Sequence, residues 1–176
     1  YYWVYKYMNH RSKFLVIIDG TEELGTAIRF AAKRAFSTKG GVVLLNIIEH
    51  LDPQQWQSVE DIIIQEARNE AEEKLKKWSN IINDMTGIVP EIVIKEGVAS
   101  EQIIDYLQED EQIRFLVLAA AVGENPGPLV SLLAGKKSGV LPAPVVVIPS
   151  GITNDSIDDL ASVSYTHLRA HETQFH

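Results

Sequence analysis

The sequence predicts an α/β fold: a doubly wound three-layer sandwich around a five-stranded parallel sheet with strand order 3-2-1-4-5. Short runs rich in β-branched residues alternate with amphipathic helical stretches along the middle of the chain, the pattern of a layered α/β domain. The run at 13–19 is apolar from Phe14 to Ile18 and ends in an acid, and the run at 115–121 is continuously apolar, as strands buried on both faces are. We expect these two strands to lie side by side, with the third and fifth strands at the edges and right-handed crossovers between strands.

The first helix is expected to follow the first strand directly. Thr21 can cap it, with Glu22 and Glu23 in the first turn, where the helix dipole favours acidic side chains. Apolar residues at three- and four-residue steps form its buried stripe: Leu24, Ala27, Ile28, Ala31 and Ala35. Gly40 and Gly41 end this helix, and residues 42–48 predict the second buried strand.

A long helix is expected between the second and third strands. Ser58 and Asp61 resemble a capping box at its start, and Gly87 stops it. One face of the helix carries its apolar residues: Ala67, Ala71, Leu75, Trp78, Ile82 and Met85. Residues 90–95 then alternate apolar and charged side chains, which predicts a strand near the edge of the sheet.

A third, shorter helix is expected to begin at Ser100, which can cap it. After the fourth strand the chain breaks into a glycine- and proline-rich loop, and Pro128 suits the first turn of a helix that runs to about Lys137. Residues 145–148, with a proline on each side, predict an edge strand. Residues 152–161 predict a last short helix, capped by Asn154 or Asp155.

The two ends differ in composition from the rest of the chain. Five of the six tyrosines and four of the five histidines fall near them, and the apolar periodicity stops after Ala161. We therefore expect one domain over residues 8–162, with 1–7 and 163–176 as non-native or disordered extensions.

Composition excludes several function classes. The chain has no cysteine, so disulfides, thiolate metal sites and a cysteine nucleophile are excluded. A net charge of −8 without a basic stripe argues against a nucleic-acid partner. No apolar run approaches the roughly 18 residues of a membrane span, so we expect no membrane partner.

The topology predicts where a ligand would bind. Strand order reverses between the first and fourth strands, so a crevice is expected beyond Asp19, Gly20 and Thr21 on one side and residues 119–127 on the other. Asp19 could contact a nucleotide or hold a metal there; alternatively, it is a carboxylate stabilised by a helix N-terminus. A metal cluster of Asp19 with Glu49 and His50 is not expected, because one histidine beside scattered acids is usually a solvated loop.

Several segments resemble the universal stress protein family in order and spacing. They are the run Phe-Leu-Val-Ile-Ile-Asp-Gly-Thr at 14–21, the Glu-Gly turn at 96–97 with Ser-Glu-Gln-Ile at 100–103, the loop at 125–131 and the strand with its flanking residues at 143–149. The resemblance implies a cytoplasmic dimer induced by stress, with some members binding ATP and others not. Nucleotide-binding members carry G-x-x-G, nine residues and then G-S/T after the fourth strand.

The chain departs from that motif. Ala119 stands where the first glycine would be, and Gly135 is followed by Lys136 instead of serine or threonine. Nucleotide binding, with Mg-dependent ATP as the candidate cofactor, is therefore expected to be weak or lost. The residues that would contact the nucleotide are Asp19, Gly20, Thr21, Ala119, Gly123, Gly127, Ser131, Gly135 and Lys136.

Three functions follow from the sequence. The first is a stress-response module that binds and does not catalyse; the second is an ATP-binding member with slow hydrolysis; the third is an α/β enzyme acting on a nucleotide-like substrate. No nucleophile paired with a base is visible, so we expect no catalytic residue. A homodimer is expected through the edge strand at 145–148, with further protein partners unidentified.

Overall fold

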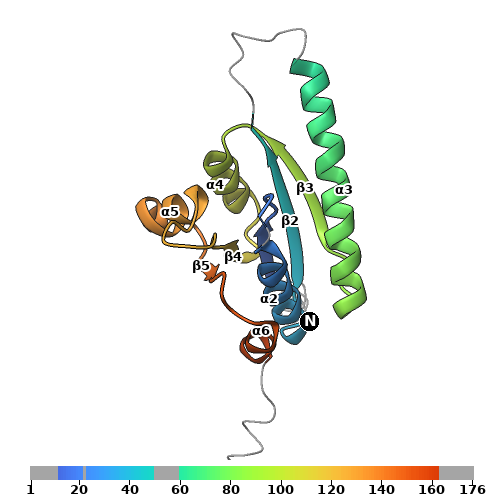
Figure 1. Cartoon of the computed structure of the whole chain (residues 1–176), viewed down its shortest axis with the longest axis vertical. Helices are drawn as coiled ribbons and strands as arrows, with labels where there is room; N and C mark the ends of the chain where they lie inside the picture. Colours follow the sequence, from blue (N-terminus) through green and yellow to red (C-terminus); the bar gives the residue numbers. More distant parts are fainter. Residues whose placement is uncertain (1–11, 22, 50–59, 163–176) are drawn as a thin grey trace, which may run out of the picture.

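The computed structural model describes residues 12–21, 23–49 and 60–162 (Figure 1). The extensions expected at 1–7 and 163–176 lie outside the described residues. So does Ser58, the first residue of the expected capping box.

The sheet is five-stranded and entirely parallel, with the order β3-β2-β1-β4-β5. This confirms the predicted fold class and strand order. The two central strands end earlier than expected, although Ile18 and Ala120 still donate their backbone N–H groups to Leu45 and Ile148 on the neighbouring strands. The strands are β1 (Lys13–Ile17), β2 (Gly41–Ile48), β3 (Glu91–Glu96), β4 (Ile113–Ala119) and β5 (Val145–Ile148).

Helices cover both faces of the sheet, which makes three layers (Figure 1). One face is covered by α2 (Leu24–Ser37), α3 (Glu60–Thr86) and α6 (Asn154–Ala161). The other is covered by α4 (Ala99–Glu109) and by α5 (Pro128–Ser131), which continues into the π-helical turn η1 (Leu132–Lys136). A short 3₁₀ turn, η2 (Ser138–Val140), leads toward β5.

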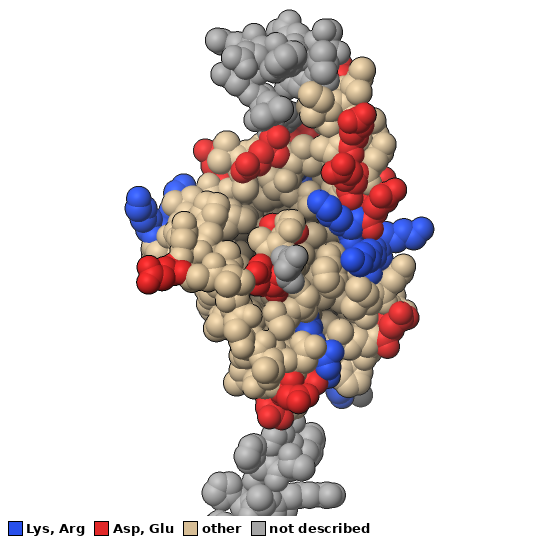
Figure 2. Space-filling model, viewed as in Figure 1, with Lys and Arg blue, Asp and Glu red and all other residues tan. Residues whose placement is uncertain are grey.

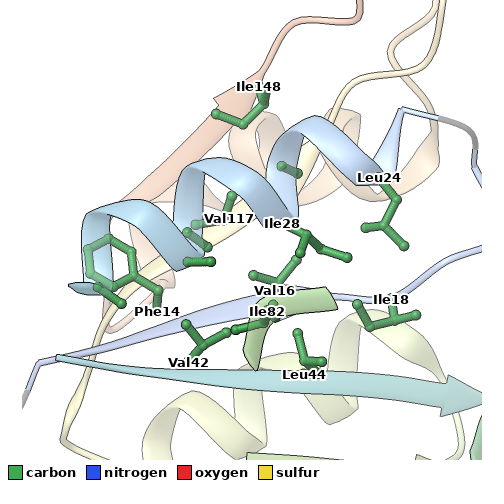
Figure 3. Packing of buried hydrophobic residues seen from close by; sticks show 14 of the residues in the cluster. Phe14, Val16, Ile18, Leu24, Ile28, Val42, Leu44, Ile82, Val117 and Ile148 are labelled. Carbon is green, nitrogen blue, oxygen red and sulfur yellow. The ribbon is translucent and has the colours of Figure 1, made fainter. Parts of the chain in front are cut away.

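Alternation along β1 explains why its residues from Phe14 to Ile17 are all apolar. Phe14 and Val16 point to the α2 and α3 face, where Figure 3 shows Val16 with Ile28 of α2 and Ile82 of α3. Leu15 belongs to the separate cluster under α4 and α5. Helices cover both faces of the strand, so all four residues from Phe14 to Ile17 are apolar and buried.

The buried stripe of α2 is confirmed, because all five of the predicted apolar residues are inaccessible to solvent. The predicted Thr21 cap is wrong. The helix begins at Leu24 with Glu23 as its N-cap, and the Thr21 hydroxyl donates to the Asp19 side chain at 2.6 Å instead. The charged carboxylate of Asp19 is a strong hydrogen-bond acceptor, and it holds the Thr21 hydroxyl in the turn before the helix. Thr21 therefore belongs to the turn and not to the helix.

Two other predicted caps are also wrong. The N-cap of α4 is Val98, and Ser100 lies inside the first turn with no capping bond. The N-cap of α6 is Thr153, whose hydroxyl accepts from the Ser156 backbone N–H at 3.2 Å. The expected single helix from Pro128 to about Lys137 changes character after one turn, since the Lys137 N–H donates to the Leu132 carbonyl five residues back.

The last helix is held on α2 by packing and by charge. Ile157 of α6 is fully buried in the α2 cluster. Asp158 accepts from Arg29 Nε at 2.7 Å and Nη2 at 2.8 Å, and pairs with Lys33 Nζ at 2.9 Å. The Arg29 hydrogen bonds hold the pKa of Asp158 well below its usual range, against a smaller opposing effect of burial.

In the part of the chain that the structure describes, no helix combines the length and the apolar composition needed to cross a bilayer. On the face in Figure 2, acidic and basic side chains form separate small groups, with basic residues beside the middle of α3.

Candidate functional site

A cavity of about 580 Å³ opens beyond the carboxyl ends of β1 and β2, between the starts of α4 and α5. We call it the β1–β2 cavity. Most of its wall is apolar, and three polar side chains face it: Asp19, Glu49 and Ser100. The apolar wall consists of Ile17, Ile18, Ile47, Val98, Ala99, Pro128, Leu129 and Leu132. Parallel sheets form such a crevice next to the point where strand order reverses.

Asp19 lies where β1 gives way to a turn. One of its carboxylate oxygens accepts from the Thr21 backbone N–H at 3.1 Å and from the Thr21 hydroxyl at 2.6 Å. These bonds fix the side chain at the cavity edge. The second carboxylate oxygen has no bond to the described residues and can accept from a ligand.

Glu49 joins β2 to α4. Its carboxylate accepts from the Ala99 backbone N–H at 3.4 Å, at the start of the helix, where the dipole favours an anion. Asn46 joins β2 to β1 in a similar way, because its Nδ2 donates to the Ile18 carbonyl at 3.0 Å. The ends of β1, β2 and α4 are thus held together around the cavity.

Ser100 was predicted as a helix cap and lies instead in the cavity wall. Sequence reasoning missed this role. A serine three residues after a glycine turn fits both a cap and a first-turn position, and only the packing of α4 against β2 separates the two. No signal in the sequence could have found it.

A second, smaller cavity of about 310 Å³ lies between the end of β2 and α3. Asp19 and Glu49 line this cavity as well, so both carboxylates are shared between the two. Gly20 lines it from the turn, and Glu70 and Lys74 line it from α3. Its described charged residues are therefore three acids and one base.

Two backbone N–H groups of the loop after β4 are already hydrogen-bonded within the loop. Gly123 and Gly127 have φ values of +100° and +101°, a region in which glycine is favoured. The Gly127 N–H is taken by the Asn125 side chain at 3.1 Å, and the Ala121 N–H by the Pro126 carbonyl at 3.0 Å. Pro126 and Pro128 have no N–H to offer.

The other predicted contact residues are placed as follows. Ala119 is the last residue of β4, in register with Ile148 of β5. Ser131, Gly135 and Lys136 are exposed on the helical segment after the loop, and none of them lines either cavity. Of the predicted set, the structure brings Asp19 to both cavities and Gly20 to the smaller one.

No group of three or more metal-ligating side chains comes together within the described ranges 12–21, 23–49 and 60–162. Asp19 and Glu49 both face the β1–β2 cavity. His50, the third member of the cluster considered from the sequence, lies outside the described residues.

Comparison with known proteins identifies the family. Residues 10–123 match the model of the universal stress protein family. A comparison with curated protein sequences finds no match.

Solved structures of low identity share the fold. A universal stress protein UspA from Lactobacillus plantarum superposes with a TM-score of 0.66 at 18% identity, covering 78% of this chain and 97% of that one. One from Archaeoglobus fulgidus has a TM-score of 0.61 at 20% identity, covering 82% and 98%. A universal stress protein in complex with cAMP has a TM-score of 0.56 at 14% identity, covering 80% and 98%.

Proposed function

The chain belongs to the universal stress protein family, and we propose that it acts by binding and not by catalysis, with a weak adenine-nucleotide site in the β1–β2 cavity. The observation that carries this proposal is the position of the cavity, at the strand ends next to the reversal of strand order, with Asp19 at its edge. The related structure in complex with cAMP supports a nucleotide ligand.

Weak affinity follows from the loop after β4. A phosphate is usually held by several backbone N–H groups at the start of a helix. Here the Gly127 N–H already donates to Asn125, and the prolines at 126 and 128 supply no donor. The β1–β2 cavity itself is lined by two carboxylates and by no basic side chain among the described residues. The triphosphate of ATP therefore gains little electrostatic binding free energy from the groups that line the cavity.

The alternative function is slow ATP hydrolysis, in which a general base must present a free carboxylate oxygen to the attacking water. One Asp19 oxygen is held by the Thr21 backbone N–H and hydroxyl, so a single oxygen remains to accept from a ligand or from water. Both functions would therefore use this same side chain, and a measurement of ATP turnover separates them.

Calorimetric titration of the full chain with ATP, with and without Mg²⁺, tests the proposal. We expect weak binding of ATP. Asp19→Ala should lower the affinity for adenosine, which has no phosphate for Asp19 to repel, by about 10-fold, because one hydrogen-bonded contact to a charged group is worth about that factor. Asp105→Ala, an exposed acid on α4, is the matched control and should leave the affinity unchanged. ATP turnover that Asp19→Ala abolishes would instead favour the hydrolytic alternative.

We further propose a homodimer through β5. The carbonyls of Pro144 and Ile148 accept from β4, so the alternation of a parallel ladder turns the backbone groups of Val145 and Val147 away from β4. This outer edge has no partner among the described residues. Pairing it with the same strand of a second copy would satisfy these groups in an isologous interface.

Light scattering at micromolar concentration measures the mass directly, and a dimer is expected. Val147→Pro removes one outward N–H while leaving the β4 ladder intact, so it should give a folded monomer. Ile92→Pro is the control that should stay dimeric, because it likewise removes an outward N–H of an exposed residue, here on the opposite edge strand β3. A monomeric parent chain would refute the interface.

We also propose that the protein works in the cytoplasm and serves a partner protein of the stress response. Family membership is the support for both. Fractionation of cells expressing the full chain would test the location.

A further inference from the structure

Ser100 has a hydroxyl without a protein partner. The residue is 8% exposed and is the one buried polar residue among those that the structure describes. No described residue hydrogen-bonds its side chain. No side-chain polar atom in the described ranges is both fully enclosed and unpaired, so the Ser100 oxygen reaches open space. That space is the β1–β2 cavity, which Ser100 lines.

The Ser100 hydroxyl has no protein partner and faces the space of the cavity, so both its donor and its acceptor capacity are available there. A ligand that fills the cavity can supply the missing bond. Ser100 can either donate or accept, whereas the carboxylates of Asp19 and Glu49 can only accept. The polar groups of the cavity therefore match a ligand rich in hydroxyl or amino donors.

The same groups oppose an anionic ligand. Asp19 and Glu49 both line the cavity, and no basic side chain among the described residues does. Lys74 lies across β2 in the smaller cavity, opposite three acids. Each phosphate brought into the cavity would meet two like charges in surroundings less polar than water, where repulsion is stronger.

We propose that the β1–β2 cavity selects an uncharged nucleoside over its phosphorylated forms. This inference rests on the proposed function. The carboxylates of Asp19 and Glu49 accept from the sugar hydroxyls or the base amino group, and Ser100 supplies the remaining polar contact. The apolar residues of β1, β2 and α5 cover the base. A volume of about 580 Å³ is within the usual size of small-molecule sites.

Titration of the full chain with adenosine, AMP and ATP tests the selection. We expect the affinity to fall at each added charge, by about 10-fold or more from adenosine to ATP at low ionic strength. The difference between the adenosine and ATP affinities should become smaller as the salt concentration rises, because dissolved ions screen the repulsion between partly exposed charges. Equal or tighter binding of ATP would overturn the inference and leave the proposed nucleotide site standing. Absence of binding by all three compounds would overturn both.

Ser100→Ala tests the serine separately. We expect adenosine affinity to fall about 5- to 10-fold, as for loss of one hydrogen bond, with no loss of stability in urea because the hydroxyl has no protein partner to lose. Ser37→Ala, an exposed serine on α2, should change neither quantity. Unchanged adenosine affinity in Ser100→Ala would refute its role as a contact. A loss of stability in that variant would show a structural role instead.

Discussion

Gly127 shapes the loop that places α5 against the β1–β2 cavity, and replacing it should be costly. Its φ of 101° and ψ of 160° fall in a region that is almost exclusive to glycine. A Cβ built there would meet nothing within 4 Å, so the penalty for Gly127→Ala is backbone strain alone. Such strain lowers the free energy of unfolding by about 1–3 kcal/mol. Alanine also reduces the conformational entropy of the unfolded chain, which raises the free energy of unfolding by about 0.4–1 kcal/mol.

We therefore expect Gly127→Ala to lower the free energy of unfolding by about 1–2 kcal/mol in urea titration. Gly20→Ala is the matched control, because its added Cβ also has free space and its φ lies outside the glycine region. That variant should be neutral, or more stable by about 0.4–1 kcal/mol. Equal effects of the two substitutions would refute the reasoning, since they differ in backbone conformation and not in contacts.

Two further predictions concern α6. Ile157→Ala removes a fully buried side chain and should cost about 2–5 kcal/mol in urea unfolding, whereas exposed Leu160→Ala should cost less than 1 kcal/mol. Asp158 has a lower pKa in the folded chain than its ordinary value of 3.8. Its ion pair with Arg29 therefore stabilises the fold fully above that value and is lost as pH falls below it. Asp158→Asn should make the pH dependence of stability shallower below pH 3.8, and an unchanged slope would contradict the assignment.

The strand order was predictable because central strands are buried on both faces and edge strands are not. The apolar or mixed side chains of each strand indicate this difference in burial. Phe14 to Ile18 contain no polar side chain since helices cover both faces of β1. Residues 91–96 of β3 mix charged and apolar side chains, and half-buried Ile94 on that edge strand reflects the mixture. Pro128 likewise marked the start of its helix correctly.

The caps and the cavity wall were less predictable, since several residues can serve each role. Thr21 is bound by Asp19, Ser100 is turned into the cavity, and Thr153 caps α6 in place of the two predicted candidates. Each outcome depends on backbone angles within one or two residues of a helix start. The π-helical turn after Ser131 has no sequence signature of its own, and it ends the regular helix that Gly135 and Lys136 were expected to share.

The measurement that tests the central claim most directly is a map of backbone amide shifts in the ¹⁵N-labelled full chain on addition of adenosine. The account predicts the largest changes at Asp19, Ala99, Ser100 and Leu129, around the β1–β2 cavity, with little change in α6. Shifts centred on α6, or on the opposite end of the sheet near Lys13, would contradict it.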